Sequence, residues 1–261
     1  MKLKEKQAIY QDIYWKVIMR MLFPYFMDFH LPNVNKHIDY EQPIEFLDKE
    51  FQKIFPDDPN ASMMRNDKLV KVVLKNGAKR NILIHIEIEA EAKATFVERM
   101  FRYFYRIYDH FKGERITALA VYTGEKIPKI HNRFTYDDMG TKVTYEFNTF
   151  VVKDKSEEEL LASSNPFALA TLAIKYAYKT KEDGEQRAKF KLILMHLALE
   201  RNYSRDEIIH LLTFIEFILI LPKDIELKYS SDFEQLHRST CLLYTSPSPR
   251  DLSTSRMPSS A

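Results

Sequence analysis

Residues 67–89 read Asp-Lys-Leu-Val-Lys-Val-Val-Leu-Lys-Asn-Gly-Ala-Lys-Arg-Asn-Ile-Leu-Ile-His-Ile-Glu-Ile-Glu, and this stretch predicts a β-hairpin. Asn76-Gly77 lies between two β-rich runs, and both positions of the favoured tight turn need positive φ. In the second arm, isoleucine occupies every second position. Because successive side chains of a strand point to opposite faces, we expect the isoleucines to be buried, with His85, Glu87 and Glu89 together on the other face.

Three acids lie near the open end of this hairpin. Asp67 begins the first arm, so folding the hairpin brings it toward Glu87 and Glu89 at the end of the second. Carboxylate oxygens are the ligands that hard divalent cations prefer, so the hairpin predicts the outline of a divalent-metal site. From the alternation alone, the two glutamates could instead form the solvated face of an ordinary antiparallel strand.

Residues 241–261 differ from the Lys-, Ile- and Glu-rich remainder of the chain. They resemble the conceptual translation of a transposon-end sequencing adapter: 241–251 match its constant part, 252–254 cover the sample index and 255–261 match the flow-cell end. We interpret this segment as foreign, and the alternative is a genuine Ser- and Pro-rich disordered tail. On the first interpretation, the natural C-terminus is expected to be missing and the one cysteine of the chain is not native.

The charge of residues 1–240 is nearly balanced. Without Arg250, Arg256 and Asp251, the 39 Lys and Arg residues and the 37 Asp and Glu residues of the chain fall to 37 and 36. A net charge near zero gives no global nucleic-acid footprint, so any basic surface must be local. The length supports one domain with an ample core, or one domain with a helical extension.

The sequence favours a cytoplasmic protein without a membrane-spanning segment. Lack of native cysteine excludes disulfides and Cys-based zinc sites and is typical of a reducing compartment. The start, Met1–Gln7, lacks the apolar core of a signal peptide. The most apolar run, Leu211–Pro222, contains Glu216 and is about a dozen residues long, whereas a membrane span needs about twenty.

Hydrophobic periodicity predicts the order of elements along the chain. Helices are expected over 7–29, with a break near Pro24, over 41–55 and over 95–111. Strands are expected within 67–90, over Ile116–Tyr122 and over 141–152. From Ser156 the pattern is helical, with breaks at Asn165-Pro166 and Asp183-Gly184. The central part therefore reads helix, hairpin, helix, strand.

Five stretches in this part carry a resemblance to a known family. They are Glu45–Glu50, Asp67–Lys71, His85–Glu89, Arg99–Asp109 and Ala118–Thr123. In this order they resemble the PD-(D/E)XK nuclease superfamily, and specifically its Rpn-like recombination-promoting nucleases, which are also described as YhgA-like transposases. The resemblance implies an α/β fold with a restriction-endonuclease-like mixed sheet flanked by helices, followed here by a C-terminal helical extension.

We accordingly divide the chain into four parts: an N-terminal helical segment (1–39), a nuclease-like core (40–153), a helical region (154–228) and a disordered segment (229–261) that includes the adapter-like tail.

The resemblance also implies hydrolysis of DNA phosphodiester bonds with Mg²⁺, or with Mn²⁺ as an alternative. Carried over residue by residue, Asp67 and Glu87 are the metal-binding acids. Glu89 stands where the superfamily has Lys and where these relatives usually have Gln, so it offers neither a cation nor an amide donor; we interpret it as a third carboxylate ligand. Such a metal would polarise the scissile phosphate and bind the attacking water.

Other residues have supporting roles on this interpretation. Glu50, on the helix before the hairpin, is a candidate supporting acid, and Glu45 is nearly as good. His85 is a candidate for contacting phosphate or for shuttling a proton, the alternative being an ordinary polar-face residue.

Three arginines form a candidate DNA-binding stripe. Arg99, Arg102 and Arg106 are spaced three and four apart, so they share one helix face, and arginines beside a metal site suit the phosphates of DNA. A solvated helix face is the alternative.

The sequence therefore predicts a cytoplasmic, metal-dependent DNA endonuclease that promotes recombination. Two alternatives stay open. One is a degenerate nuclease fold that binds DNA without cutting it, because Glu89 departs from the family pattern. The other is a protein-interaction or homo-oligomerisation module formed by the helical part, residues 156–228.

Overall fold

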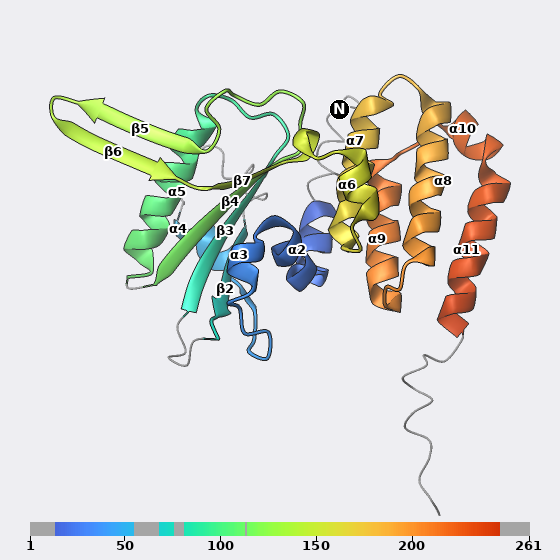
Figure 1. Cartoon of the computed structure of the whole chain (residues 1–261), viewed down its shortest axis with the longest axis horizontal. Helices are drawn as coiled ribbons and strands as arrows, with labels where there is room; N and C mark the ends of the chain where they lie inside the picture. The colour runs from blue at the N-terminus through green and yellow to red at the C-terminus, as the bar shows by residue number, and fades with distance from the viewer. Residues whose placement is uncertain (1–13, 55–67, 76–80, 113, 246–261) are drawn as a thin grey trace, which may run out of the picture.

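The computed structural model of the chain describes residues 14–54, 68–75, 81–112 and 114–245. It has a mixed α/β architecture, with a five-stranded sheet in the order β1-β2-β3-β4-β7 and a separate two-stranded sheet, β5-β6. Helices pack on both faces of the larger sheet, and a further group of helices lies beside it (Figure 1). The predicted mixed sheet flanked by helices is confirmed.

The larger sheet is antiparallel in one half and parallel in the other. Its strands are β1 (Glu45–Phe46), β2 (Lys68–Val73), β3 (Asn81–Glu89), β4 (Arg115–Tyr122) and β7 (Asn148–Val151). Antiparallel pairs join β1 to β2 and β2 to β3, whereas β3 pairs with β4, and β4 with β7, in parallel. A parallel pair needs a crossover connection, which α5 (Phe96–His110) supplies between β3 and β4.

The predicted hairpin strands are confirmed. Their register pairs Lys68 with Ile86 at one end and Val73 with Asn81 at the other. The predicted turn at Asn76-Gly77 and the predicted ligand Asp67 lie outside the described residues.

Strand β3 is buried on both of its faces. Ile84 and Ile86 point into the largest core, together with residues of α2 and of the helical region. On the opposite face, Leu83 packs with side chains of α4 (Asp48–Ile54) and α5. The expectation that the isoleucines are buried is confirmed for Ile84, Ile86 and Ile88, and Ile82 is partly buried against the same core. The opposite face is not a solvated one, because α4 and α5 cover it.

The N-terminal elements partly follow the prediction. Residues 14–21 are helical, and α2 (Phe23–His30) begins after a break at Leu22, with Pro24 in its first turn. The predicted break near Pro24 is therefore confirmed. Proline is tolerated there because its missing N–H would have no partner within the helix. A short helix, α3 (Pro32–Asn35), follows.

The predicted helix over 41–55 is wrong in its first half. Residues Glu45 and Phe46 form the edge strand β1, and the helix begins only at Asp48. Phe46 packs against Phe23, with ring centroids 5.6 Å apart, whereas Leu47 packs in the core on the other face of the sheet. Of the four apolar residues expected on one helical stripe, Ile44 packs against the largest core, whereas Leu47, Phe51 and Ile54 pack in the core on the other face of the sheet.

A β-hairpin projects from the sheet next to α5 (Figure 1). Its strands are β5 (Arg133–Asp138) and β6 (Thr141–Glu146), so the predicted strand over 141–152 is in fact two strands, β6 and β7. Met139 and Gly140 form its turn with φ values of 45° and 87°, as tight hairpin turns require. Phe134 stacks on Phe101 of α5, with centroids 4.8 Å apart, which fixes the base of the hairpin.

Between β7 and residue 245 the described chain is mainly helical. The elements are η2 (Val152–Asp154), α6 (Glu157–Ala162), α7 (Pro166–Lys179), α8 (Gly184–Glu200), α9 (Arg205–Ile218), α10 (Lys223–Lys228) and α11 (Ser230–Thr245). The predicted breaks are confirmed: the side chains of Asn165 and Asp183 accept backbone N–H groups at the starts of α7 and α8.

Helix α11 differs from the disorder predicted for 229–261. It is helical over 230–245, where Phe233 and Leu236, three residues apart, are both buried. One continuous core extends from Trp15 to Leu236 and joins the N-terminal helices, one face of the sheet and the helical region.

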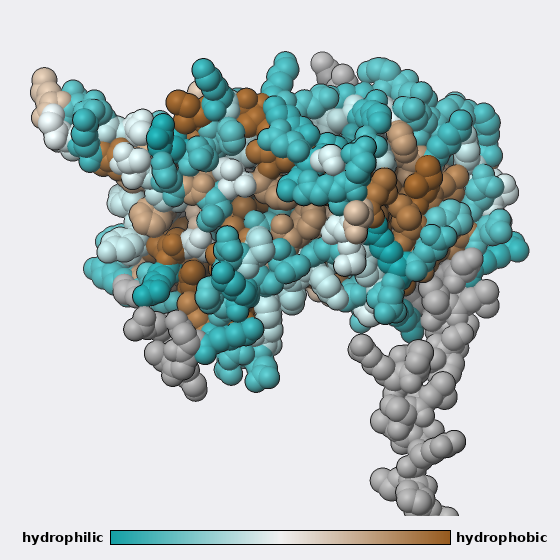
Figure 2. Space-filling model, in the orientation of Figure 1, coloured by the Kyte–Doolittle hydropathy of each residue, from teal (hydrophilic) through white to brown (hydrophobic). Residues whose placement is uncertain are grey.

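The surface in the view of Figure 2 is mainly hydrophilic, with a hydrophobic area over α8 and α9. In the part of the chain that the structure describes, no helix is both long and apolar enough to cross a membrane.

His30 is a buried histidine in an aromatic environment. Its Nδ1 lies 2.9 Å from the carbonyl oxygen of Phe26, and its ring packs against those of Trp15, Phe150 and Phe167. Burial lowers the pKa of His30 from its ordinary 6.5 to about 3. The folded protein therefore keeps this imidazole neutral under conditions in which the unfolded chain protonates it.

This difference predicts a loss of stability in mild acid. Above pH 6.5 the histidine is neutral in both states; as the pH falls from 6.5 toward 3, only the unfolded state gains the proton. At pH 5.5 the free energy of unfolding should be lower by about 1.4 kcal/mol from this group alone. Urea unfolding at pH 7.5 and 5.5 tests this, with His30→Gln as the control. An equal loss in the variant and the wild type would contradict the assignment.

Candidate functional site

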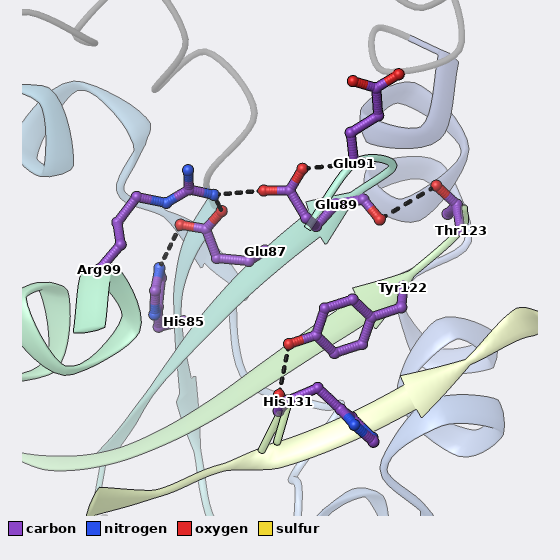
Figure 3. Close-up of polar contacts among 8 residues, drawn as sticks. All are labelled: His85, Glu87, Glu89, Glu91, Arg99, Tyr122, Thr123 and His131. Carbon is purple, nitrogen blue, oxygen red and sulfur yellow. Dashed lines mark hydrogen bonds and ion pairs between the residues drawn. The ribbon is translucent and has the colours of Figure 1, made fainter. Parts of the chain in front are cut away.

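The predicted acids lie at the carboxyl end of β3. Because β3 and β4 are parallel, their carboxyl ends meet at one edge of the sheet, where Glu89 is paired with Tyr122. In sheets with parallel strands, ligands bind in the crevice outside these ends. Residues 90–95 alone separate β3 from α5, so the first turn of α5 starts beside the same edge (Figure 3).

Glu87 and Glu89, which we call the acid pair, share one cationic partner. Nη2 of Arg99 lies 2.6 Å from Oε2 of Glu89 and 3.5 Å from Oε2 of Glu87. The side chain of Glu87 is only 1% exposed, against 19% for Glu89 and 30% for Arg99. A buried carboxylate is costly without a positive partner, so Arg99 stabilises the ionised acid pair.

Further contacts fix the guanidinium and the carboxylates. The guanidinium of Arg99 lies over the ring of Phe96, with its central carbon 4.8 Å from the ring centroid. Oε1 of Glu89 accepts the backbone N–H of Glu91 at 3.2 Å, and Oε1 of Glu87 lies 3.3 Å from Nε2 of His85. Each carboxylate oxygen of the pair therefore has a nitrogen neighbour, which orients both groups.

His85 is buried beneath the acid pair. Its ring packs against those of Phe51 and Tyr103, each with a centroid 5.5 Å away, and these two rings also contact each other, with centroids 5.6 Å apart. The residue is 0% exposed. The sequence placed His85 on an open polar face, where it could contact phosphate. The structure instead places it against Glu87, because α4 and α5 close over this face of β3.

The other predicted site residues lie on α4 and α5, or outside the described residues. Glu50 lies half-buried on α4, and among the described residues it makes no hydrogen bond or ion pair with the acid pair. Of the predicted arginine stripe, Arg99 turns to the acid pair, Arg102 is exposed and Arg106 is half-buried. Asp67 lies outside the described residues and stays a prediction.

Tyr122 closes the site on the β4 side. Burial raises the pKa of the Tyr122 phenol, and the negative charge of Glu89 raises it further. Its hydroxyl donates a hydrogen bond to the carbonyl oxygen of His131 at 2.5 Å (Figure 3). Tyr122 is therefore a neutral donor that holds the segment before β5 against the end of the sheet.

The donor set fits a hard divalent cation. Among the described residues, no group of three or more His, Cys, Asp and Glu side chains is placed to hold a metal ion. Mg²⁺, however, usually takes one or two protein carboxylates and completes its shell with waters and substrate phosphates. The acid pair offers such a set of oxygen donors, and Arg99 provides the positive charge beside it.

The contact between Arg99 and the acid pair is the feature that sequence reasoning missed. Arg99 was expected to bind DNA phosphates as part of a stripe on its helix. The available signal was the short connection 90–95, which forces the first turn of α5 to lie near the end of β3.

Comparison with known proteins adds no relative: no family model, no curated protein and no solved structure matches the chain. Membership of the PD-(D/E)XK superfamily stays a prediction from the five sequence stretches.

Gly124 allows a close approach of the two strand ends. A Cβ atom at this position would lie 1.8 Å from the carbonyl oxygen of Ala90, which follows β3 directly. Just before it, the backbone N–H of Thr123 donates to the carbonyl oxygen of Glu89 at 3.0 Å. Any side chain at 124 therefore forces the ends of β3 and β4 apart.

We expect Gly124→Ala to lower the free energy of unfolding by about 1–3 kcal/mol, because the clash is with backbone. Gly184→Ala is the matched control, since its new Cβ would lie 3.1 Å from the movable Cγ1 of Ile225. Urea unfolding of both variants measures the difference. Equal stabilities for the two variants would contradict the close approach at Ala90.

Arg99→Met should destabilise the fold by about 3 kcal/mol, because it removes the positive charge that lies 3.5 Å from the buried carboxylate of Glu87. Arg102→Met removes an exposed arginine three residues along the same helix and should change stability by less than about 0.5 kcal/mol. Thermal and urea unfolding at neutral pH test the difference. A similar effect of both substitutions would show that the acid pair does not depend on Arg99.

Proposed function

We propose that this protein is a metal-dependent endonuclease that hydrolyses phosphodiester bonds of DNA. The observation that carries the proposal is the convergence of two carboxylates, one of them buried, at the carboxyl end of β3 beside a parallel neighbour. The element order α4, β2, β3, α5, β4 agrees with the order expected from the nuclease resemblance. That resemblance supports DNA as the substrate, and a recombination role stays part of the proposal.

Glu87 and Glu89 would hold Mg²⁺, or Mn²⁺, with Asp67 as the predicted third acid. The bound metal would supply charge to polarise a scissile phosphate and would lower the pKa of a bound water. Contacts within the chain hold the two carboxylates in place: the backbone N–H of Glu91 donates to Glu89, and His85 lies against Glu87.

Other groups of the chain would position the substrate. Arg102 is exposed on α5, on the same helix as Arg99, and suits a backbone phosphate of DNA. Such contacts hold the nucleic acid without reading its sequence. Glu89 lacks both the positive charge of the lysine in the superfamily motif and the amide of the glutamine usual in the Rpn-like relatives. Arg99 is a cationic side chain beside the pair.

Cleavage of supercoiled plasmid by the full chain tests the proposal. We expect nicking in Mg²⁺ and none in EDTA. Glu87→Ala should lower the cleavage rate at least about a hundredfold. Mutation of a residue that only hydrogen-bonds to a metal ligand already costs about 10–100-fold in metal affinity or activity, and Glu87 would be a ligand itself. Glu89→Gln should also cut more slowly if this carboxylate is a ligand. Glu98→Gln, an exposed acid on the same helix as Arg99, is the control and should cut like the wild type.

Two results would change the proposal. If Glu89→Gln cuts faster than the wild type, the glutamate is a partial defect at a position better served by an amide. If the folded wild type does not cut in Mg²⁺ or Mn²⁺, the endonuclease proposal is wrong, and retention of DNA by the protein would then favour a DNA-binding protein with a degenerate site.

A further inference from the structure

The acid pair already has a cation against it. One nitrogen, Nη2 of Arg99, is within 3.5 Å of an oxygen of Glu87 and 2.6 Å of an oxygen of Glu89. The guanidinium therefore lies against both carboxylates at once. Its charge compensates the pair in the arrangement that the structure shows.

A divalent cation cannot share these oxygens with the guanidinium at low cost. An ion bound to the same Oε2 atoms would lie within a few ångströms of Nη2, and like charges at such distances repel strongly, most of all in a partly buried site. Glu87 cannot compensate by turning away, because its side chain is buried and its other oxygen faces His85.

Arg99 is the most exposed side chain of this group. It is 30% exposed, whereas Glu87 is 1% exposed, and it enters the site from a helix at the edge of the sheet. Its stacking on Phe96 leaves the far end of the guanidinium on the carboxylates. A rotation of this long side chain would free the carboxylate oxygens without any change in the backbone of β3.

We propose that Arg99 and a divalent cation compete for the acid pair, so that cation binding releases the guanidinium from Glu89 toward solvent. This inference rests on the proposed metal-dependent function and assigns Arg99 as the group that sets the affinity of that site for the metal. A released guanidinium has the planar, forked geometry that suits a phosphate, so the same exchange would present it to the substrate. By linkage, the cation and Arg99 weaken each other's hold on the pair by the same factor.

Binding of Mn²⁺ to the full chain, followed by electron paramagnetic resonance without any substrate, tests the competition. Arg99→Gln removes the competing charge and should bind Mn²⁺ about tenfold more tightly, or better. Arg115→Gln, at an exposed arginine that starts β4 and so lies at the opposite end of the sheet from Glu89, is the matched control and should bind like the wild type. Unfolding curves recorded with and without Mn²⁺ show that Arg99→Gln is folded, and Mn²⁺ should stabilise it more than the wild type.

A second measurement uses the wild-type protein and does not depend on a variant that folds. Modification of arginines by phenylglyoxal, read by mass spectrometry of the peptides, reports how accessible each guanidinium is. Mn²⁺ should increase the rate at Arg99 severalfold and leave the rate at Arg102 unchanged.

The outcomes separate this inference from the proposed function. If the wild type and Arg99→Gln bind Mn²⁺ equally and the modification rate at Arg99 does not change, the competition is wrong while metal-dependent cleavage can stand. If neither protein binds Mn²⁺, both the competition and the metal-dependent function are overturned.

Discussion

Parallel pairing of β3 with β4 is the constraint on which the rest of the site depends. Two parallel strands cannot be joined by a tight turn, so the chain must cross over through α5. The crossover has three consequences at one edge of the sheet: the carboxyl ends of both strands meet there, the first turn of α5 starts there, and Gly124 passes close to Ala90. The acid pair and Arg99 come together because the crossover starts directly after the acids.

The electrostatics of this edge favour a functional explanation over a purely structural one. Burying a carboxylate requires a partner whose attraction offsets the lost hydration, and a well-packed apolar pair often serves stability as well or better. Glu87 is nevertheless buried between His85 and Arg99, in a strand whose other buried positions are mostly isoleucine or leucine. A charged group kept at such a position is typical of a site that binds or reacts, although structural ion pairs occur there too.

Local periodicity was enough to predict much of the fold. Alternation identified β3, the continuous apolar run identified β4, and Asn165 and Asp183 marked the starts of two helices. Prediction failed where distant residues decide the outcome. Phe46 is in a strand because it pairs with Val70 and packs on Phe23, and neither contact is visible in the pattern of 41–55.

The site shows the same division between local and distant information. The spacing of Glu87 and Glu89 placed both on one face of a strand, and the structure agrees. Alternation could not tell that α4 and α5 would cover this face and bury His85, because what packs on a strand depends on elements elsewhere in the chain. Likewise, Arg99 shares a helix face with Arg102 in sequence, yet the crossover directs only the first of them toward the acids.

The same parallel pair also sets the order in which the protein can be assembled during synthesis. Strand β3 gains its antiparallel partner from residues that precede it, but its other edge is completed only by β4, after the whole of α5 has left the ribosome. Until then the nascent chain carries a long, isoleucine-rich strand with an open hydrogen-bonding edge, the kind of surface that recruits strands from other chains. A partner distant in sequence must be found before this edge is protected, and such closures are slow. The crossover that assembles the acid pair therefore also makes the newly made chain dependent on the arrival of residues 115–122.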